Sequence, residues 1–479
     1  MQRITPGPAW PLHDAAATRA IESAAAASLP PHTLMQRAGE AVARLALALA
    51  PHARTVWVAC GPGNNGGDGL EAAMHLRHWG LSPVVTWLGD EARAPADALA
   101  ALLRARAAGV VLAAEPPANF GLAIDALFGL GSRRGLEGQA AQWARRMVLA
   151  HAPVLAVDLP SGLDANTGVC PSNAVQANHT LSLLTLKPGL FTAQGRDAAG
   201  QVWFDTLGVA ADTAAPTAHL LPATEDRPRP HDSHKGSWGD VAVVGGAPGM
   251  TGAALLAARA ALHGGAGRVF LGLLDGGSMA VDPGQPELML RPVDTLDFTD
   301  LHLACGCGGG EAVRAVLPRA LHQARTLVLD ADALNAVAAD TALQALLRSR
   351  CGRGKPTVLT PHPLEAARLL QCTAGEVQAD RLAAARALAA RLGATTVLKG
   401  SGTVVATADG TTWINPTGNA RLATAGTGDV LAGMVAARLA AGANAAVAAG
   451  QAVFLHGQAA DDQDAGRALV ASTLVGARG

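Results

Sequence analysis

Short apolar runs alternate with longer amphipathic stretches through the first part of the chain. The apolar runs, rich in Val, Leu and Ala, are typical of buried strands and cover residues 55–59, 83–88, 110–113, 122–127, 154–157 and 180–186. Helical periodicity is clearest between them at residues 70–79 and 139–149. Because buried strands that alternate with helices form mostly parallel sheets with helices on both faces, the pattern predicts a doubly wound α/β domain.

The same alternation starts again after a polar break. Four prolines punctuate this break, which we interpret as a linker: Pro216, Pro222, Pro228 and Pro230. Further strand-like runs follow at residues 241–244, 268–273, 301–304, 326–329, 357–359, 396–398 and 404–406. No sequence repeat relates the two parts, so the chain of 479 residues is predicted to hold two different α/β domains, at residues 1–218 and 219–479.

Composition narrows the classes of protein to consider. With 49% hydrophobic and 16% charged residues, the chain can bury two large cores. A net charge of −1, no Tyr and only 7 Phe argue against nucleic-acid binding. The longest apolar stretch, residues 430–456, is interrupted by Arg438, Gly442 and Asn444, so it predicts two buried helices and no membrane span.

The cysteines and the N-terminus favour a cytoplasmic location. The 6 cysteines show neither a C-x-x-C pair nor a regular spacing, which is typical of reduced thiols. The first residues, from Met1 to Pro6, lack the apolar core of a signal peptide.

The segment from Ala425 to Asp429 carries the clearest chemistry. Ala425, Gly426 and Gly428 leave backbone N–H groups free to surround an anion, and a helix predicted to begin near Thr427 adds the positive end of its dipole. The Asp429 carboxylate lies beside this anion site and can accept a proton from an attacking hydroxyl. An anion site next to a base suits phosphoryl transfer, although a helix N-terminus with Asp in its first turn has the same sequence without any catalysis.

A second glycine-rich segment, residues 61–69, follows a predicted strand and precedes a predicted helix. Its sequence matches the dinucleotide pattern G-x-G-x-x-G, but Asp68 would repel a bound pyrophosphate. The side chains of Asn64 and Asn65 and the free carbonyls offer neutral oxygen ligands, which suit a hard cation and a polar ligand better.

Two further strands end in polar side chains. One run ends near Asp125 and continues into a glycine loop, and the other ends near Asp158 and continues to Ser161. Since ligands bind at the carboxyl ends of parallel strands, these three side chains could converge with Asn65. Turn formation is the alternative explanation, and Ser161 lacks the G-x-S-x-G context of a hydrolase.

Together these segments resemble the NAD(P)H-hydrate epimerase family over residues 10–210. The motifs occur in order at residues 34–39, 63–69, 125–129, 158–162 and 187–190, with Gln36 where the family commonly has Glu. The resemblance implies a Rossmann-like three-layer sandwich. It also implies that K⁺ is bound through Asn65, Asp125 and Ser161, and that Asp158 moves the proton on the substrate hydroxyl. It implies contacts to hydrated NADH or NADPH from Asn64, Asn65, Gly66, Gly67, Asp68, Gly129, Leu130, Gly131, Ser132, Arg133, Arg134, Gly135 and Asp158.

The second part resembles NAD(P)H-hydrate dehydratase, a member of the ribokinase-like superfamily, over residues 225–475. Its motifs lie at residues 234–240, 245–254, 329–334, 360–365, 397–403 and 425–429. The family pattern Gly-Pro-Gly-Leu-Gly is present as Gly306-Cys307-Gly308-Gly309-Gly310, so we expect a less constrained loop there. The resemblance implies Asp429 as the catalytic base. It implies hydrate contacts from Ala253, Gly308, His362 and Asp429, and adenine-nucleotide contacts from Lys399, Gly400, Ser401, Gly402, Thr403 and Gly428.

The two resemblances imply a bifunctional enzyme that repairs hydrated nicotinamide nucleotides. It would epimerise the R and S hydrates of NADH and NADPH, and it would dehydrate the S form with ADP, giving AMP and phosphate. Phosphorylation turns the hydroxyl into a good leaving group, which the ring nitrogen then helps to expel. ADP as the donor, Mg²⁺ beside it and assembly into a homo-oligomer rest on the resemblance alone.

Three other functions fit parts of the sequence. A ribokinase-like small-alcohol kinase would share the Asp429 loop, but the epimerase-like first part argues against it. The first part could instead be a non-catalytic binding module, which Asp158 and the complete segment from Asn64 to Asp68 disfavour. An NAD-dependent dehydrogenase is weakened by Asp68 and by the absence of a matching catalytic set.

Overall fold

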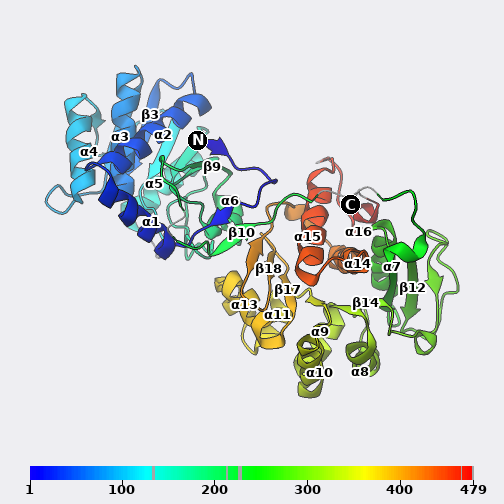
Figure 1. Ribbon diagram of the computed structural model, residues 1–479. Coiled ribbons are helices and arrows are strands. Elements are labelled where there is room, and N and C mark those ends of the chain that lie inside the picture. Colours follow the sequence, from blue (N-terminus) through cyan, green and yellow to red (C-terminus); the bar gives the residue numbers. More distant parts are fainter. Residues whose placement is uncertain (132–134, 212–213, 225–228, 465, 477–479) are drawn as a thin grey trace. The chain divides into compact units, whose positions relative to one another are not determined.

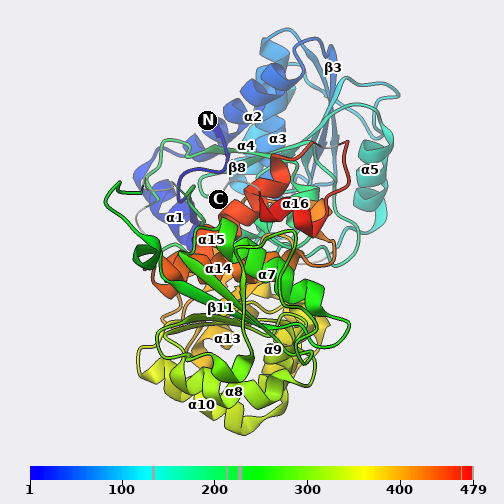
Figure 2. The same ribbon diagram turned by 90° about the vertical axis from the view of Figure 1, so that its right-hand side faces the viewer.

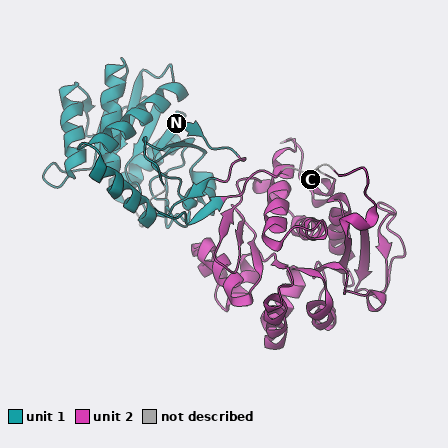
Figure 3. Ribbon diagram, in the orientation of Figure 1, with its two compact units in different colours: residues 1–5, 10–219 teal, residues 6–9, 220–479 magenta. Residues whose placement is uncertain are grey.

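The computed structural model describes residues 1–131, 135–211, 214–224, 229–464 and 466–476. The chain folds into two compact units, called here unit 1 (residues 1–5 and 10–219) and unit 2 (residues 6–9 and 220–479; Figure 3). Each unit is built on a largely parallel sheet with helices between the strands, which confirms the predicted fold class. The association of residues 6–9 with unit 2 was not predicted from the sequence.

The sheet of unit 1 has the strand order β1-β9-β8-β7-β6-β3-β4-β5 (Figure 1). Neighbouring strands are parallel except β1 and β9. The strands are β1 (Gln2–Arg3), β3 (Thr55–Cys60), β4 (Ser82–Trp87), β5 (Val111–Leu112), β6 (Leu122–Ala126), β7 (Val154–Val157), β8 (His179–Leu183) and β9 (Gln201–Asp205). The six predicted apolar runs correspond to β3 through β8, whereas β1 and β9 were missed.

Helices cover both faces of this sheet. Alternation along β3 sends Val56 and Val58 toward one face, where they join a core with α2 (Thr33–Leu49), α3 (Asn64–His78) and α4 (Ala96–Ala107). Trp57 points to the other face and packs against Trp143 of α5 (Gly138–Leu149). These layers form the predicted three-layer sandwich, and α1 (Ala15–Ser28), α6 (Gly195–Ala198) and the short helix η1 (Pro188–Phe191) complete the helices of the unit.

The helix predicted at residues 70–79 begins six residues earlier, at Asn64. Glycine is a poor helix former, and for this reason its cluster was interpreted as a loop. The glycines instead permit close packing, because a Cβ on Gly66 would lie 2.0 Å from the carbonyl oxygen of Gly61. A Cβ on Gly67 would lie 2.8 Å from Cε of Met35. Tertiary packing therefore outweighs the low helix propensity at this point.

The sheet of unit 2 follows the order β13-β12-β11-β14-β15-β16-β17-β18-β19, parallel as far as β17 and antiparallel from there to β19. The strands are β11 (Asp240–Gly245), β12 (Arg268–Leu273), β13 (Met289–Leu290), β14 (His302–Cys305), β15 (Thr326–Leu329), β16 (Thr357–Leu359), β17 (Thr395–Leu398), β18 (Val404–Ala406) and β19 (Thr412–Ile414). The seven predicted strands are all present. A short antiparallel pair, β2 (Pro11–Leu12) with β10 (Ala218–Leu220), forms within the segments where the chain enters and leaves unit 1.

Two groups of helices enclose the sheet of unit 2 (Figures 1 and 2). On one face lie α7 (Thr251–His263), α14 (Thr427–Ala440), α15 (Ala445–Asp461) and α16 (Ala471–Val475). On the other lie α8 (Val313–Gln323), α9 (Ala331–Ala339), α10 (Thr341–Gly352), α11 (Pro363–Leu370) and α13 (Arg381–Leu392), with α12 (Ala374–Ala379) between the last two. The short 3-10 helices of the unit are η2 (Lys235–Trp238), η3 (Val293–Thr295) and η4 (Ala420–Leu422).

The apolar stretch at residues 430–456 lies in α14 and α15, which confirms the prediction of two buried helices. Gly433 brings α14 against α7, since a Cβ there would lie 2.0 Å from the carbonyl oxygen of Ala257. None of the described helices is long and apolar enough to cross a membrane.

Candidate active sites

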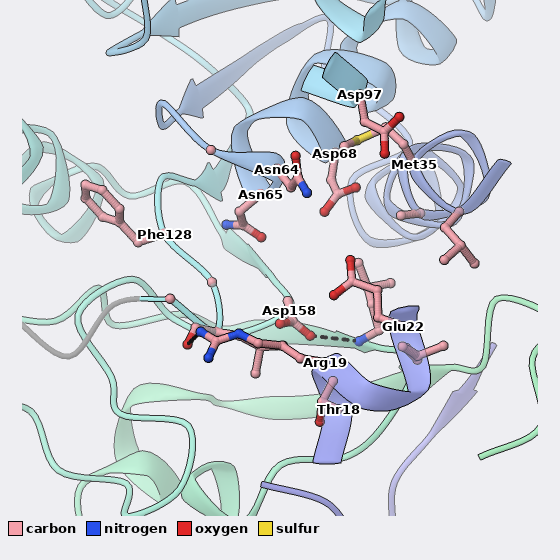
Figure 4. Close-up of a pocket in the computed structure, with 18 of the residues that line it drawn as sticks. Thr18, Arg19, Glu22, Met35, Asn64, Asn65, Asp68, Asp97, Phe128 and Asp158 are labelled. Carbon is pink, nitrogen blue, oxygen red and sulfur yellow. Dashed lines mark hydrogen bonds between the residues drawn. The ribbon is translucent and has the colours of Figure 1, made fainter. Parts of the chain in front are cut away.

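A cavity of about 930 Å³ opens in unit 1 beside the carboxyl ends of β3, β6 and β7 (Figure 4). Eight of the predicted substrate-binding residues line it: Asn64, Asn65, Asp68, Gly129, Leu130, Gly131, Gly135 and Asp158. Gly66 and Gly67 do not, because they lie in the tightly packed part of α3. Ser132, Arg133 and Arg134, also predicted to bind substrate, lie outside the described residues.

Asp158 follows β7 and is held by a buried lysine. Its φ of 65° places a non-glycine residue in the left-handed region, a strained conformation that often marks functional sites. Lys187, whose side chain is fully buried, forms an ion pair with the Asp158 carboxylate (dashed line in Figure 4) and donates to the Leu183 carbonyl oxygen at 2.7 Å. The Leu183 N–H donates to the same carboxylate at 3.1 Å. The sequence placed Lys187 in a motif but gave no sign of this pairing.

Further acidic side chains face the cavity from elements that the sequence did not implicate. Figure 4 shows Glu22 of α1 and Asp97 of α4 around the same space as Asp68. Burial, and then the charges of Asp158 and Glu22, raise the pKa of Asp68 well above its usual range. Burial, followed by Asp158, also raises the pKa of Glu22. The carboxylate of Asp97 is hydrogen-bonded to His32, with 2.5 Å between Oδ1 of Asp97 and Nδ1 of His32.

Asp125 and Ser161 meet directly, as the convergence of strand ends predicted. Oδ1 of Asp125 accepts from the Ser161 hydroxyl at 2.6 Å, and Oδ2 accepts from the Ser161 N–H at 2.8 Å. Burial raises the pKa of Asp125 to about 6, although these hydrogen bonds oppose the shift. Nearby, Gly129 packs against Asn65, whose Nδ2 is buried without a hydrogen-bond partner among the described residues. This part of the site is rich in oxygen atoms and holds a buried carboxylate that no described cation neutralises.

In unit 2, Asp429 lies in the first turn of α14, which begins at Thr427 as predicted. Gly426 precedes the helix with a φ of 89°, a conformation that glycine adopts readily. Acceptor atoms of Cys307, Asp330 and Asp429 all lie within 4.8 Å of one another. Burial, and then the charge of Asp330, raises the pKa of Asp429 to about 6.

Lys399 connects three of the predicted motifs. Its Nζ lies 2.7 Å from Oδ1 of Asp330, which also accepts from the Thr360 hydroxyl at 2.8 Å. The same Nζ would lie 3.2 Å from a Cβ on Gly428, so the absence of a side chain there lets the ammonium approach the start of α14. The segment from Gly400 to Thr403 forms a turn after β17, in which the Thr403 hydroxyl donates to the Gly400 carbonyl oxygen at 3.1 Å.

His362 and the glycine loop complete the site. Nδ1 of His362 accepts from the N–H of Leu364 at 3.1 Å and caps α11, while Nε2 lies 3.2 Å from Oε1 of Glu365. The pKa of Glu365 is raised to about 7, mainly by burial. A structural role as a helix cap therefore accounts for one ring nitrogen of His362, and contact with a substrate stays a prediction.

Hydrogen bonds fix the backbone of the loop at residues 306–310, and the expectation that it is less constrained than the family pattern stays a prediction. The carbonyl oxygens of Cys307 and Gly308 accept from the N–H groups of Gly246 and Ala247 at 2.9 and 2.7 Å. The Gly310 N–H donates to Asp332 at 2.8 Å. Positive φ angles of 119°, 56° and 53° at Gly306, Gly308 and Gly310 explain why glycines occupy these positions. Gly308 packs against Ala253, so these two predicted substrate contacts are neighbours.

Comparisons with known proteins match both parts of the chain. A family model described as NAD(P)H-hydrate dehydratase matches residues 241–477, and one described as YjeF-related protein N-terminus matches residues 31–189. The bifunctional NAD(P)H-hydrate repair enzyme Nnr of Escherichia coli is 36% identical over 458 residues, covering 92% of this chain and 87% of the relative. The enzyme of the same name from Moorella thermoacetica is 37% identical over 467 residues, covering 88% of this chain and 86% of the relative.

A solved structure also resembles this chain. It is an ADP/ATP-dependent NAD(P)H-hydrate dehydratase from Bacillus subtilis co-crystallised with ATP/Mg²⁺, 31% identical, with a TM-score of 0.45. The match covers 52% of this chain and 90% of that one.

Proposed function

The chain belongs to the family of bifunctional NAD(P)H-hydrate repair enzymes, and we propose that its two units divide the two reactions between them. Unit 1 epimerises the R and S hydrates of NADH and NADPH. Unit 2 dehydrates the S hydrate back to NAD(P)H with ADP as phosphoryl donor, giving AMP and phosphate. The alternative of a small-alcohol kinase fused to a binding module is not favoured, because the relatives named as repair enzymes match the chain through both units.

Epimerisation needs a proton moved on and off the hydroxyl of the hydrate. The carbon that carries this hydroxyl also bears the ring nitrogen, so the hydroxyl can leave as water and water can return to the other face. Asp158 is proposed to carry the proton, since it lines the cavity and the buried ammonium of Lys187 fixes its carboxylate. Asp68, whose pKa is raised by burial, is a second carboxyl that lines the same cavity.

The residues around Asp125 fit a potassium ion. They offer carboxylate, hydroxyl and carbonyl oxygens and no soft ligand, and Asp125 is a fully buried anion. We propose that Asn65, Asp125 and Ser161 hold K⁺. When bound, the ion would neutralise the Asp125 carboxylate and stabilise the neighbouring loop from Phe128 to Gly131.

Dehydration is proposed to proceed by phosphoryl transfer in unit 2. The hydroxyl oxygen of the hydrate attacks the terminal phosphorus of ADP, and AMP leaves. Asp429 accepts the proton of this hydroxyl during the attack. The N–H groups at the start of α14 and the ammonium of Lys399 stabilise the negative charge of the transferred group. The ring nitrogen then expels phosphate, and loss of a proton from the adjacent carbon restores the double bond of NAD(P)H. Mg²⁺ is expected to arrive with the nucleotide, because phosphate oxygens are its preferred ligands.

The observation that carries the dehydratase proposal is Asp429 at the N-terminus of α14, beside Lys399 and Asp330. The test is Asp429→Asn, which keeps the shape but removes proton acceptance. Recovery of NADH from its S hydrate should fall by roughly 10²–10⁴-fold, the scale of general-base loss. Nucleotide binding should change little, and epimerisation by the same chain should be unchanged. Recovery near that of the unchanged chain would sink the proposed role of Asp429.

Assays of the unchanged chain with ADP, with ATP and without nucleotide identify the phosphoryl donor. Recovery of NADH with ATP but not with ADP would refute ADP as the donor.

A cytoplasmic location and a homo-oligomer are further proposals. All 6 cysteines are free thiols, which fits a reducing compartment, and light scattering of the purified chain measures the assembly.

A further inference from the structure

The cavity of unit 1 is rich in acidic side chains, although its proposed substrate is itself an anion. Those that line it are Glu22, Asp68, Asp97, Glu137 and Asp158. A hydrated dinucleotide carries a negatively charged diphosphate, and the hydrate of NADPH carries a further phosphate on its adenosine ribose. Because like charges repel one another, the phosphates need a cation within reach of the cavity.

Of the described residues that line the cavity, three are basic, and two of these already have an acidic partner. The ammonium of Lys187 is fully buried and paired with Asp158. His32 is hydrogen-bonded to Asp97. The third, Arg19 of α1, is exposed and forms no ion pair with any described residue. Arg19 is therefore the lining cation that is available to a phosphate.

Helix α1 is fixed so that Arg19 lies at the cavity. The buried hydroxyl of Thr18 is hydrogen-bonded to the hydroxyl of Thr185 at 2.7 Å, which ties the helix to the segment after β8. Residues three and four apart share one face of a helix, and the face of α1 that lines the cavity carries Thr18, Arg19, Glu22 and Ala26. No site residue was predicted in this helix from the sequence.

The guanidinium of Arg19 reaches the loop that follows β6. Its Nη2 donates to the Leu130 carbonyl oxygen at 3.1 Å, and Figure 4 shows the side chain extending away from Glu22. A guanidinium has five N–H donors, and those on Nε and Nη1 have no acceptor among the described residues. The N–H groups of Gly129 and Gly131 likewise have no described acceptor. Side-chain and backbone donors for an anion thus lie close together.

We propose that Arg19 binds a phosphate group of the hydrated dinucleotide beside the loop from Gly129 to Gly131, and thereby holds the hydrated ring toward Asp158. This inference rests on the proposed function of unit 1. The planar fork of an arginine can donate two parallel hydrogen bonds to phosphate oxygens. The diphosphate and the 2′-phosphate of NADPH hydrate share this chemistry, and the two hydrates distinguish them.

The test compares three variants with the unchanged full chain. Arg19→Met removes the charge, and Arg19→Lys keeps the charge but loses the fork. Arg77→Met is the matched control, because it removes an exposed arginine of α3 that does not line the cavity. The kcat and KM for epimerisation of NADH hydrate and of NADPH hydrate are measured without nucleotide, at low and high salt. ADP-dependent dehydration of the S hydrate by the same samples reports whether unit 2 is intact.

With Arg19→Met, KM for at least one hydrate should rise roughly ten- to hundredfold, the scale of a lost hydrogen bond to a charged group. The kcat should change little, because a phosphate contact is the same in the bound substrate and in the transition state. An equal rise for both hydrates identifies the diphosphate, and a rise confined to NADPH hydrate identifies the 2′-phosphate. Arg19→Lys should recover part of the loss. Salt should raise KM of the unchanged chain more than that of Arg19→Met.

An unchanged KM for both hydrates in Arg19→Met overturns the proposal. A fall in kcat alone, or a loss with the same salt dependence as the unchanged chain, overturns it too, because the lost hydrogen bond to Leu130 would then be the cause. So does an equal rise of KM in Arg77→Met. If the unchanged chain epimerises neither hydrate, the proposed function of unit 1 fails and the phosphate contact fails with it. Epimerisation with an unmoved KM refutes the role of Arg19 alone.

Discussion

A lysine is paired with an acidic side chain in each of the two proposed sites. Lys187 is paired with Asp158 in unit 1, and Lys399 is paired with Asp330 beside Asp429 in unit 2. A charge removed from water costs several kcal/mol unless it is paired and hydrogen-bonded. In unit 1 the pair therefore stabilises the carboxylate of Asp158, the proposed proton carrier. In unit 2 Lys399 offsets the charge of Asp330 beside Asp429, the proposed base.

Replacement of Lys187 by Met should make unit 1 less stable to heat. The Asp158 carboxylate would remain largely buried without its counter-charge, and breaking such a pair costs about 3–5 kcal/mol. Epimerisation should be lost at a lower temperature than in the unchanged chain, while dehydration keeps its heat stability. Inactivation rates of the two reactions at several temperatures measure this.

The double variant Lys187→Met/Asp158→Asn is the control for Lys187→Met. It removes both charges, so it should recover most of the lost heat stability and still fail to epimerise. If the single variant is as stable as the double one, the ion pair does not stabilise unit 1.

Potassium at the proposed Asp125 site should affect epimerisation by unit 1 and not dehydration by unit 2. Exchange of K⁺ for a bulky organic cation should weaken hydrate binding and slow epimerisation, because the buried Asp125 carboxylate would lose its counter-ion. Asp125→Asn should be slow in both salts and insensitive to the exchange. Epimerisation rates under rigorously potassium-free conditions decide the matter, and an unchanged rate in the parent chain would count against the site.

At the scale of elements, glycines set the position of α3 relative to β3 and β6. Gly61 follows β3 and its N–H donates to the Ala126 carbonyl oxygen of β6 at 2.9 Å. Gly66 then packs on the Gly61 carbonyl, and Gly69 packs on Ala126. The start of α3, with Asn64, Asn65 and Asp68, is thereby held at the rim of the cavity. These three glycines serve the site by positioning polar neighbours, although none of the three lines the cavity.

Gly66→Ala should damage unit 1 through this packing. Its Cβ would lie 2.0 Å from a carbonyl oxygen whose backbone is itself tied to β6, so α3 must shift. Overpacking of this kind costs about 1–3 kcal/mol, which exceeds the gain of about 1 kcal/mol in helix propensity. Thermal unfolding and hydrate affinity should both fall. Gly63→Ala is the matched control, because a Cβ there meets nothing within 4 Å, and equal losses in the two variants would contradict the packing argument.

The sequence predicted most strands because apolar runs between helices leave a local signal. It also predicted that Asp429 lies at the start of a helix and that Asp125 and Ser161 come together, since both follow from where local elements begin or end. It failed where the cause is distant in sequence. Glu22 is a single carboxylate in α1 that belongs to no motif, and only the fold brings it to the cavity. The pairing of Lys187 with Asp158 likewise depends on β7 and β8 being neighbours, and no local pattern carries it.

At the scale of the whole molecule, each unit has its own sheet, its own buried core and its own proposed site. The buried clusters around α3 and α5 contain residues of unit 1 only. The cluster built on α7 and α14 contains residues of unit 2 only. A domain needs its own buried core to fold independently, and each unit has one. The two proposed activities can therefore be joined in one chain without any residue that serves both.

The last prediction is that the two reactions separate with the units. A chain of residues 1–218 should epimerise the hydrate without nucleotide, and residues 219–479 should dehydrate the S hydrate with ADP. A first fragment that ends at residue 224 is the matched control, because it keeps β10 whole beside β2. The second fragment lacks residues 6–9, whose Gly7 carbonyl oxygen accepts from the N–H of Ala223 at 2.7 Å, so it should be somewhat less stable than the full chain. Activity of each fragment is measured after circular dichroism shows that it is folded. If both fragments are folded and neither is active alone, the division of the reactions between the units is wrong.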